Sequence, residues 1–277
     1  MQTFKSKAPK IITPIMALIV SFFLAMATPI LAQQSAQQNN AVDAAIGLAN
    51  MLDGAGGGVS REAMLASLEA GAEAGEPIAL FRLGVMYENG DGVAKDEVKA
   101  FGYFSRIAND YASTPPKSLQ ADIVAQSFIK VGDYYRTGLP DAGIRVSNKR
   151  FHALLLHAAS YFGDADAQFR VGLLYLDKNE MGINLTQGAR WLSLAARKGH
   201  IGAQATLGDL LFKSSELADQ KIEGLMWLSL AGTRAKGSPA ELWITDLRDS
   251  AMSIATPEQR LTATNAAQSL GARFGGS

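Results

Sequence analysis

The sequence predicts an all-α fold, a right-handed αα solenoid of about five helix-turn-helix repeats closed by a C-terminal helical cap. The prediction depends on a short glycine-centred motif that recurs and on a second amphipathic segment that follows each copy. The glycines of the four clear copies lie 48, 40 and 36 residues apart. A 36-residue unit with longer variants is typical of stacked helical pairs. These glycines are Gly84, Gly132, Gly172 and Gly208.

The first helix of each repeat carries the glycine and, in three copies, an aromatic residue three positions later. A glycine inside a helix costs about 1 kcal/mol relative to alanine. Its recurrence at one position therefore predicts that a neighbouring helix backbone comes close there. The residues in the aromatic position are Tyr87, Tyr135, Tyr175 and, in the last copy, Leu211.

The second helix of each repeat carries an apolar pair, followed four residues later by a small or apolar pair. Spacings of three and four place such residues on one buried helical stripe. The copies are Tyr103-Phe104 with Ile107-Ala108, Leu154-Leu155 with Ala158-Ala159, Trp191-Leu192 with Ala195-Ala196, and Trp227-Leu228 with Ala231-Gly232.

The connections between repeats follow a pattern of their own. Gly75, Gly163 and Gly199 each precede the next motif glycine by nine residues. A glycine that ends one helix just before another begins is typical of a short αα turn. The segment 44–75 resembles a degenerate first copy, because its Gly47 lies 37 residues before Gly84.

Two copies carry insertions, and the C-terminal part departs from the repeat. We expect loops at 109–118, which contains two consecutive prolines, and at 137–148, which contains two glycines and a proline. The segments 238–241 and 256–259 both match a capping box with proline at the first helical position. They predict two further helices that cover the end of the stack, which would otherwise expose an apolar face.

The N-terminus has the layout of a secretory signal peptide. Three lysines precede a mostly apolar run from Ile11 to Leu31, and no acidic residue occurs before Asp43. Cleavage is expected after Ala27 or Ala32. An uncleaved anchor is the alternative, because the run is just long enough to span a bilayer, and either form delivers the remainder across a membrane. The predicted organisation is a signal peptide at 1–32, a polar spacer at 33–43, the repeat solenoid at 44–237, and capping helices with a tail at 238–277.

Composition excludes several classes of function. Removing the three lysines of the signal peptide from the 26 basic residues leaves 23, against 26 acidic residues. This balance argues against nucleic-acid binding, which needs a concentrated basic face, and against a polybasic membrane-surface role. The chain contains no cysteine, so it must depend on its apolar core for stability.

No constellation of residues indicates catalysis, a cofactor or a metal. His152 and His157 are five residues apart on one helix, about 140° around its axis, and cannot share a metal by helical spacing. The glycine-rich segment Gly54–Gly58 lacks the Lys-Ser/Thr of a phosphate-binding loop. Asp164 and Asp166 begin a helix, where acidic side chains complement the helix dipole. We therefore predict a protein that is not an enzyme and has no cofactor.

The candidate partner-binding residues are mainly basic. In three successive repeats a cation occupies the position two residues before the motif glycine, and stacking would align the three into a basic ladder. The alternative is a row of solvated charges. The predicted ladder consists of Arg82, Lys130 and Arg170.

Three further candidates lie at the second insertion or just before it. Because Tyr135 occupies the aromatic position and helix neighbours point about 100° apart, we expect Tyr134 to face a surface. Arg136 lies just before the insertion, and Arg145 lies within it.

Two segments carry a family resemblance. The segments LGVMYENGDGVAKDEVKAFGYFSRIA from Leu83 and AARKGHIGAQATLGDLLF from Ala195 resemble the Sel-one-like repeat family, whose members are tetratricopeptide-related αα solenoids. With the signal peptide, the YYRTGLP insertion at Tyr134–Pro140 and the two-helix end, the chain is also similar to ExoR-type exopolysaccharide regulators of Gram-negative bacteria.

The resemblance implies a function and a partner. Regulators of this type are periplasmic repressors that hold the sensor kinase of a two-component system inactive, and they have no catalytic residues to transfer. We therefore expect a periplasmic negative regulator of exopolysaccharide synthesis whose partner is the periplasmic domain of a membrane sensor kinase. The alternative is a secreted interaction scaffold for envelope or polysaccharide assembly, without a kinase partner.

Overall fold

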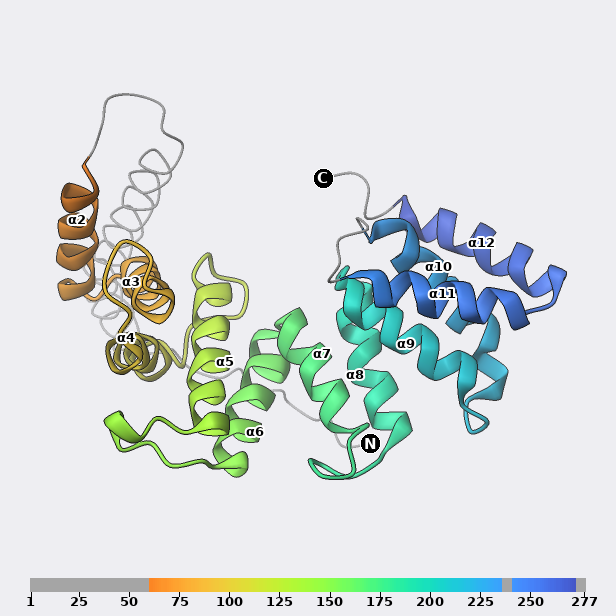
Figure 1. The fold of residues 1–277 in the computed structure, drawn as a ribbon, viewed down its shortest axis with the longest axis horizontal. Helices are drawn as coiled ribbons and strands as arrows, with labels where there is room; N and C mark the ends of the chain where they lie inside the picture. Colours follow the sequence, from red (N-terminus) through yellow and green to blue (C-terminus); the bar gives the residue numbers. More distant parts are fainter. Residues whose placement is uncertain (1–59, 236–240, 273–277) are drawn as a thin grey trace, which may run out of the picture. The chain divides into compact units, whose positions relative to one another are not determined.

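The computed structural model describes residues 60–235 and 241–272 (Figure 1). The predicted signal peptide, the polar spacer, the glycine-rich segment and most of the first predicted capping box lie outside these ranges. The chain divides into two compact units, residues 1–67 and 68–277. Of the first unit, the described residues form only the beginning of helix α2 (Arg61–Glu73).

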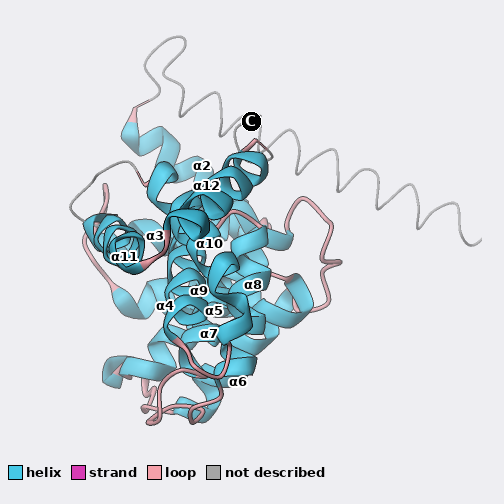
Figure 2. Ribbon diagram, turned by 90° about the vertical axis from the view of Figure 1, so that its right-hand side faces the viewer, coloured by secondary structure: helices cyan, strands magenta, loops and turns pink. Residues whose placement is uncertain are grey.

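The second unit is built from helices, and the described residues contain no strand beyond one isolated bridge (Figure 2). This confirms the predicted all-α repeat solenoid. Short 3₁₀ helices occupy Pro140–Ala142 and Ala218–Gln220, and a π-helical turn occupies Ala158–Phe162. After α2 the α-helices are α3 (Pro77–Asn89), α4 (Glu97–Asp110), α5 (Ala121–Thr137), α6 (Asn148–His157), α7 (Ala165–Leu174), α8 (Leu185–Arg197), α9 (Ile201–Lys213), α10 (Lys221–Arg234), α11 (Leu242–Ile254) and α12 (Pro257–Gly271).

Consecutive helices pack in pairs that correspond to the predicted repeats. The pairs are α3 with α4, α5 with α6, α7 with α8, and α9 with α10. Contacts of α4 with α5, and of α8 with α9, join one pair to the next. Each pair therefore buries its apolar stripe against its own partner and against the neighbouring repeat.

The C-terminal helices close the array as predicted. Helices α11 and α12 both pack against α10. At the start of α12 the Thr256 hydroxyl accepts a hydrogen bond from the Gln259 amide at 3.2 Å. The Gln259 side chain accepts one from the Thr256 amide at 3.0 Å, which completes the capping box.

The second helices bury the residues that their spacing predicted. In each apolar pair the second member is fully buried, and the two small or apolar residues that follow are buried as well. The buried second members are Phe104, Leu155, Leu192 and Leu228.

The predicted close approach of helix backbones occurs at the last two motif glycines. A Cβ atom added to Gly208 would lie 2.8 Å from the carbonyl oxygen of Gly224 in α10. At Gly172 the corresponding distance to the carbonyl oxygen of Gly188 in α8 is 3.3 Å. Each approach thus joins two glycines, and the glycine on the second helix was not recognised from the sequence.

The first two motif glycines have different surroundings. A Cβ atom at Gly84 would lie 2.6 Å from the Phe104 ring, so a side chain fills the space in that repeat. At Gly132 the nearest heavy atom, in Phe151, would lie at 3.5 Å, which is an ordinary contact. One sequence motif therefore corresponds to three different packing arrangements.

The two predicted insertions differ in their local structure. The first is a loop of turns between α4 and α5, as expected. The second is a compact turn in which the Leu139 amide donates to the Ile144 carbonyl at 2.8 Å and the Ile144 amide donates back at 3.0 Å. The Leu139 side chain is buried, so this insertion is packed against the repeats.

Candidate functional site

The predicted basic ladder is not a free positive surface. The Lys130 Nζ atom on α5 lies 2.5 Å from Glu88 Oε2 on α3, and both side chains are partly buried. Arg170 on α7 donates two hydrogen bonds to the Asp133 carboxylate on α5. Each of these cations therefore pairs with an acid on the first helix of the preceding repeat. These two cations therefore do not form a free basic stripe, because acids on the preceding first helix pair with them; their role in partner binding stays a prediction.

Two other predicted cations remain exposed. Arg82 on α3 and Arg145 in the loop between α5 and α6 are exposed. Neither has an ion-pair partner among the residues that the structure describes. The basic stripe is thus reduced to one exposed member, Arg82, with Arg145 at a separate place.

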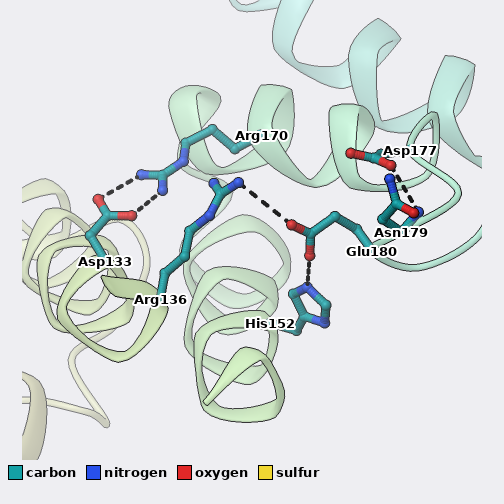
Figure 3. A network of polar contacts seen from close by, with 7 residues as sticks. All are labelled: Asp133, Arg136, His152, Arg170, Asp177, Asn179 and Glu180. Carbon is teal, nitrogen blue, oxygen red and sulfur yellow. Dashed lines mark hydrogen bonds and ion pairs between the residues drawn. The ribbon is translucent and has the colours of Figure 1, made fainter. Parts of the chain in front are cut away.

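A polar network joins the α5–α6 pair to the α7–α8 pair (Figure 3). Glu180, in the loop between α7 and α8, accepts a hydrogen bond from His152 Nε2 at 2.9 Å and faces Arg136 Nη2 at 3.5 Å. Its side chain is only 15% exposed. The guanidinium groups of Arg136 and Arg170 also lie 5.0 and 5.7 Å from the centre of the buried Phe151 ring, within cation–π range.

This network fixes a loop rather than forming a reaction centre. The acid, Glu180, comes from the loop between α7 and α8, and its two partners come from helices α5 and α6. Arg136, a predicted partner-binding residue, is therefore already engaged within the chain. Glu180 escaped recognition in the sequence, because it lies in a loop without periodicity and its partners are 28 and 44 residues away.

Tyr134 does not face a surface, and that prediction is wrong. Its side chain is 8% exposed, and its ring packs edge-to-face against Phe101 of α4 with 5.6 Å between ring centres. Burial, with a contribution from the charges of Glu88 and Glu97, raises the pKa of the Tyr134 hydroxyl. Tyr135 is the more exposed of the two tyrosines, and its hydroxyl accepts a hydrogen bond from Arg150 at 2.9 Å.

Tyr134 is buried because α5 is covered on two sides. It packs against α4 of the preceding repeat and against α6 of its own repeat. The Tyr134 hydroxyl has no hydrogen-bond partner in the described part of the chain. The position that the sequence suggested for ligand contact is therefore part of the core.

The loops within the repeats are held in one recurring way. In the loops that precede α4, α6 and α8, the N-cap side chain accepts from the backbone amide three residues later, at 2.9, 3.4 and 3.0 Å. The backbone amide of each N-cap residue also donates a hydrogen bond, to the carbonyl of the motif aromatic residue, at 2.8, 2.7 and 2.8 Å. The N-cap residues are Asp96, Ser147 and Asn184, and the carbonyls belong to Tyr87, Tyr135 and Tyr175.

The ends of successive second helices are also linked. A basic side chain near the end of one second helix donates to a carbonyl at the end of the preceding one. A cation there satisfies a carbonyl left free at a helix end and complements the helix dipole. The contacts are Arg106 to Ala72, Lys198 to Gly163, and Arg234 to Gly199.

Groups that could carry chemistry serve structural purposes. Asp164 caps α7, accepting from the Ala167 amide at 2.8 Å, as its position predicted. His200 caps α9, because its Nδ1 atom accepts a hydrogen bond from the Ala203 amide at 3.0 Å. Its Nε2 atom lies 3.8 Å from Asp166 Oδ1. The pKa of Asp166 is lowered, chiefly by the His200 imidazole and further by Arg170.

The described residues bring together no group of three or more side chains that could hold a metal ion. Two hollows in the described part of the chain have volumes of about 410 and about 360 Å³. The larger lies between the start of α4 and the loop after α5, and the smaller lies beside the end of α9. Neither contains a histidine or a paired nucleophile and base. Among the helices that the structure describes, none has the length and apolar character needed to cross a membrane.

Comparison with known proteins agrees with the helical pairs. The Sel1 repeat family matches residues 77–110 and 165–200, which correspond to α3–α4 and α7–α8. The chain carries two Sel1 repeats. The pairs α5–α6 and α9–α10 fold in the same way outside the matched Sel1 repeats.

Two curated relatives share about half of the chain. A protein named "Exopolysaccharide production negative regulator" from Rhizobium meliloti is 34% identical over 131 residues, 47% of this chain and 48% of its own. The protein of that name from Rhizobium leguminosarum bv. viciae is 29% identical over 131 residues, with the same coverage. The chain thus spans about half the length of the curated relatives that it matches.

A solved structure supports the fold. The Sel1 repeat protein from Oxalobacter formigenes superimposes with a TM-score of 0.52 at 23% identity, over 68% of this chain and 49% of that protein. At this identity the likeness concerns the arrangement of helices alone.

Proposed function

We propose that this protein is a periplasmic negative regulator of exopolysaccharide production that acts without catalysis. It binds the periplasmic domain of a membrane sensor kinase and restrains the kinase through its solenoid surface. The observation that carries the regulatory role is the 34% identity over 131 residues to the Rhizobium meliloti protein named "Exopolysaccharide production negative regulator". The predicted signal peptide supports the periplasmic location.

The described structure is consistent with binding rather than chemistry. Several of its titratable side chains serve as helix caps, inter-repeat ion pairs and loop anchors, among them Asp164, Lys130 and Glu180. Repeat solenoids offer extended surfaces that suit protein partners. A regulator that binds the inactive state of a kinase more tightly than the active state shifts the population toward inactivity by that difference in affinity.

Deletion of the gene tests the proposal. We expect exopolysaccharide output to rise in the deletion strain and to fall again when the full-length gene is returned. A version without residues 1–32 is the matched control, because it keeps the repeats but loses the predicted export signal. It should fail to restore repression.

The partner is tested separately. The exported chain should co-purify with the periplasmic domain of a sensor kinase and should reduce its autophosphorylation in membranes. Unchanged exopolysaccharide after deletion would contradict the regulatory role. Restored repression without any kinase association would favour the scaffold for polysaccharide assembly instead.

A further inference from the structure

Two exposed apolar side chains occupy matching places in successive repeats. Val146 and Ile183 each directly precede the N-cap residue of a second helix, Ser147 and Asn184 respectively. Each is 63% exposed. Because both caps donate to the carbonyl of the motif tyrosine, the two side chains leave the backbone at equivalent points.

The two loops belong to one edge of the second unit. Figure 1 shows the α5–α6 loop and the α7–α8 loop on the same, lower side of the picture. Glu180 of the second loop contacts His152 of α6 and Arg136 of α5, so the later loop lies against the earlier repeat (Figure 3). We call the exposed surface formed by 145–149 and 178–183 the loop edge.

The loop edge is ordered before any partner arrives. The α5–α6 loop is closed by paired hydrogen bonds between Leu139 and Ile144, and the α7–α8 loop is tied down through Glu180. A surface that is already fixed loses less conformational entropy on binding. At 63% exposure Val146 and Ile183 contribute little to the fold, and both are accessible to another molecule.

Charge on the loop edge is mainly positive. Arg145, Lys149 and Lys178 are exposed, and none has an ion-pair partner among the described residues. One exposed acidic residue, Asp177, directly precedes Lys178, and its carboxylate accepts a hydrogen bond from the Asn179 amide at 2.8 Å. Three exposed cations therefore share these two loops and the start of α6 with the two apolar side chains, in a chain that is slightly acidic once the predicted leader is removed.

We propose that the loop edge docks an extended segment of the protein partner, in which acidic residues stand next to apolar ones. The acidic residues would pair with the free cations, and the apolar ones would cover Val146 and Ile183. This inference rests on the proposed function, because it assigns a surface and a partner chemistry to the same binding role.

Defined peptides test the chemistry of this surface. The probes are three labelled twelve-residue peptides with alternating glutamate and leucine, lysine and leucine, or glutamate and serine. Fluorescence anisotropy with the exported full chain should give the glutamate–leucine peptide at least tenfold tighter binding than either of the others. Similar affinity for all three peptides would overturn the proposal.

Matched variants locate the surface. Val146→Asp combined with Ile183→Asp should weaken glutamate–leucine binding at least tenfold. Leu119→Asp is the control, because Leu119 is 88% exposed but lies in the loop between α4 and α5; it should bind as the wild type does. Unchanged binding by the double variant would overturn the assignment.

A charge variant provides a second test of the loop edge if the Val146/Ile183 double variant is strongly destabilised. Arg145→Glu, Lys149→Glu and Lys178→Glu together should reverse the preference, so that the lysine–leucine peptide binds more tightly. These side chains are exposed and make no ion pair within the described ranges, so the fold should tolerate the change. A preference that stays with the glutamate peptide would contradict the proposal.

Complementation of the deletion strain separates this inference from the proposed function. If the wild-type gene fails to lower exopolysaccharide, the regulatory role itself is wrong. If the wild type and Leu119→Asp repress while the folded Val146/Ile183 double variant does not, the loop edge is supported. If all three repress equally, the loop edge is wrong and the regulatory role stands.

Discussion

Replacing Gly208 by alanine should destabilise the protein, because the added methyl group meets backbone. A Cβ atom there would lie 2.8 Å from the Gly224 carbonyl oxygen and 2.8 Å from the Leu228 amide nitrogen, both on α10. Backbone atoms cannot turn aside, so α9 and α10 would have to separate. Overpacking typically costs about 1–3 kcal/mol, and this contact belongs at the upper end. Alanine also gains about 1 kcal/mol in helix propensity over glycine. We therefore expect the free energy of unfolding to fall by about 2 kcal/mol.

The matched controls are alanine at two other helical glycines. Gly102 on α4 has no atom within 4 Å of an added Cβ, so its replacement should gain about 0.5–1 kcal/mol. Gly132 shares the motif position with Gly208, but its nearest contact would be 3.5 Å, so its replacement should be neutral or mildly stabilising.

Thermal unfolding followed by circular dichroism measures the difference. At about 2–4 °C per kcal/mol for a domain of 150–250 residues, Gly208→Ala should lower Tm by about 4–8 °C. The Gly102 variant should raise Tm by a few degrees. Equal stability of the Gly208 and Gly102 variants, or a loss at Gly132 as large as at Gly208, would refute the packing argument.

Three further predictions concern side chains. Tyr134→Phe should raise stability by about 1 kcal/mol, because it removes a buried hydroxyl without a partner, whereas Tyr135→Phe should not; urea unfolding compares them. Glu180→Gln should cost about 1 kcal/mol and speed hydrogen exchange in the α7–α8 loop; unchanged exchange would show that its contacts are dispensable. The pKa of Asp166 lies below its ordinary value of 3.8, chiefly because His200 faces it. Its ionised form therefore stabilises the fold above that pH, and this contribution disappears as the pH falls through the folded pKa. Asp166→Asn should accordingly lose less stability than the wild type between about pH 5 and about pH 2; parallel curves would contradict this.

The helical pairs were predictable because their signals are local. A glycine that ends a helix and an apolar pair four residues before a small pair each concern one turn or one stripe. The capping box at Thr256 and the cap at Asp164 are equally local, and both occur as expected. Short-range rules of backbone geometry are enough for such features.

The surface predictions failed where the answer depended on how repeats stack. Lys130 pairs with Glu88, and Arg170 pairs with Asp133, at separations of 42 and 37 residues. Helical periodicity correctly placed Tyr134 away from Tyr135, but it did not show that α4 covers that second face through Phe101. The contacts of a first helix with the preceding repeat need the register of the stack, which one sequence does not supply.

The ion pairs along the first helices bear on where we propose that a partner binds. A partner that paired its own acids with Lys130 or Arg170 would have to displace Glu88 or Asp133, and breaking a partly buried pair leaves a charge without its partner. A partner at the loop edge meets cations that are already free. The same network serves that edge, because Glu180 holds the α7–α8 loop against α5 and α6. The charges that close the ladder and anchor the loop thus stabilise the stack of repeats, and the cations left outside this network are the ones available to a partner.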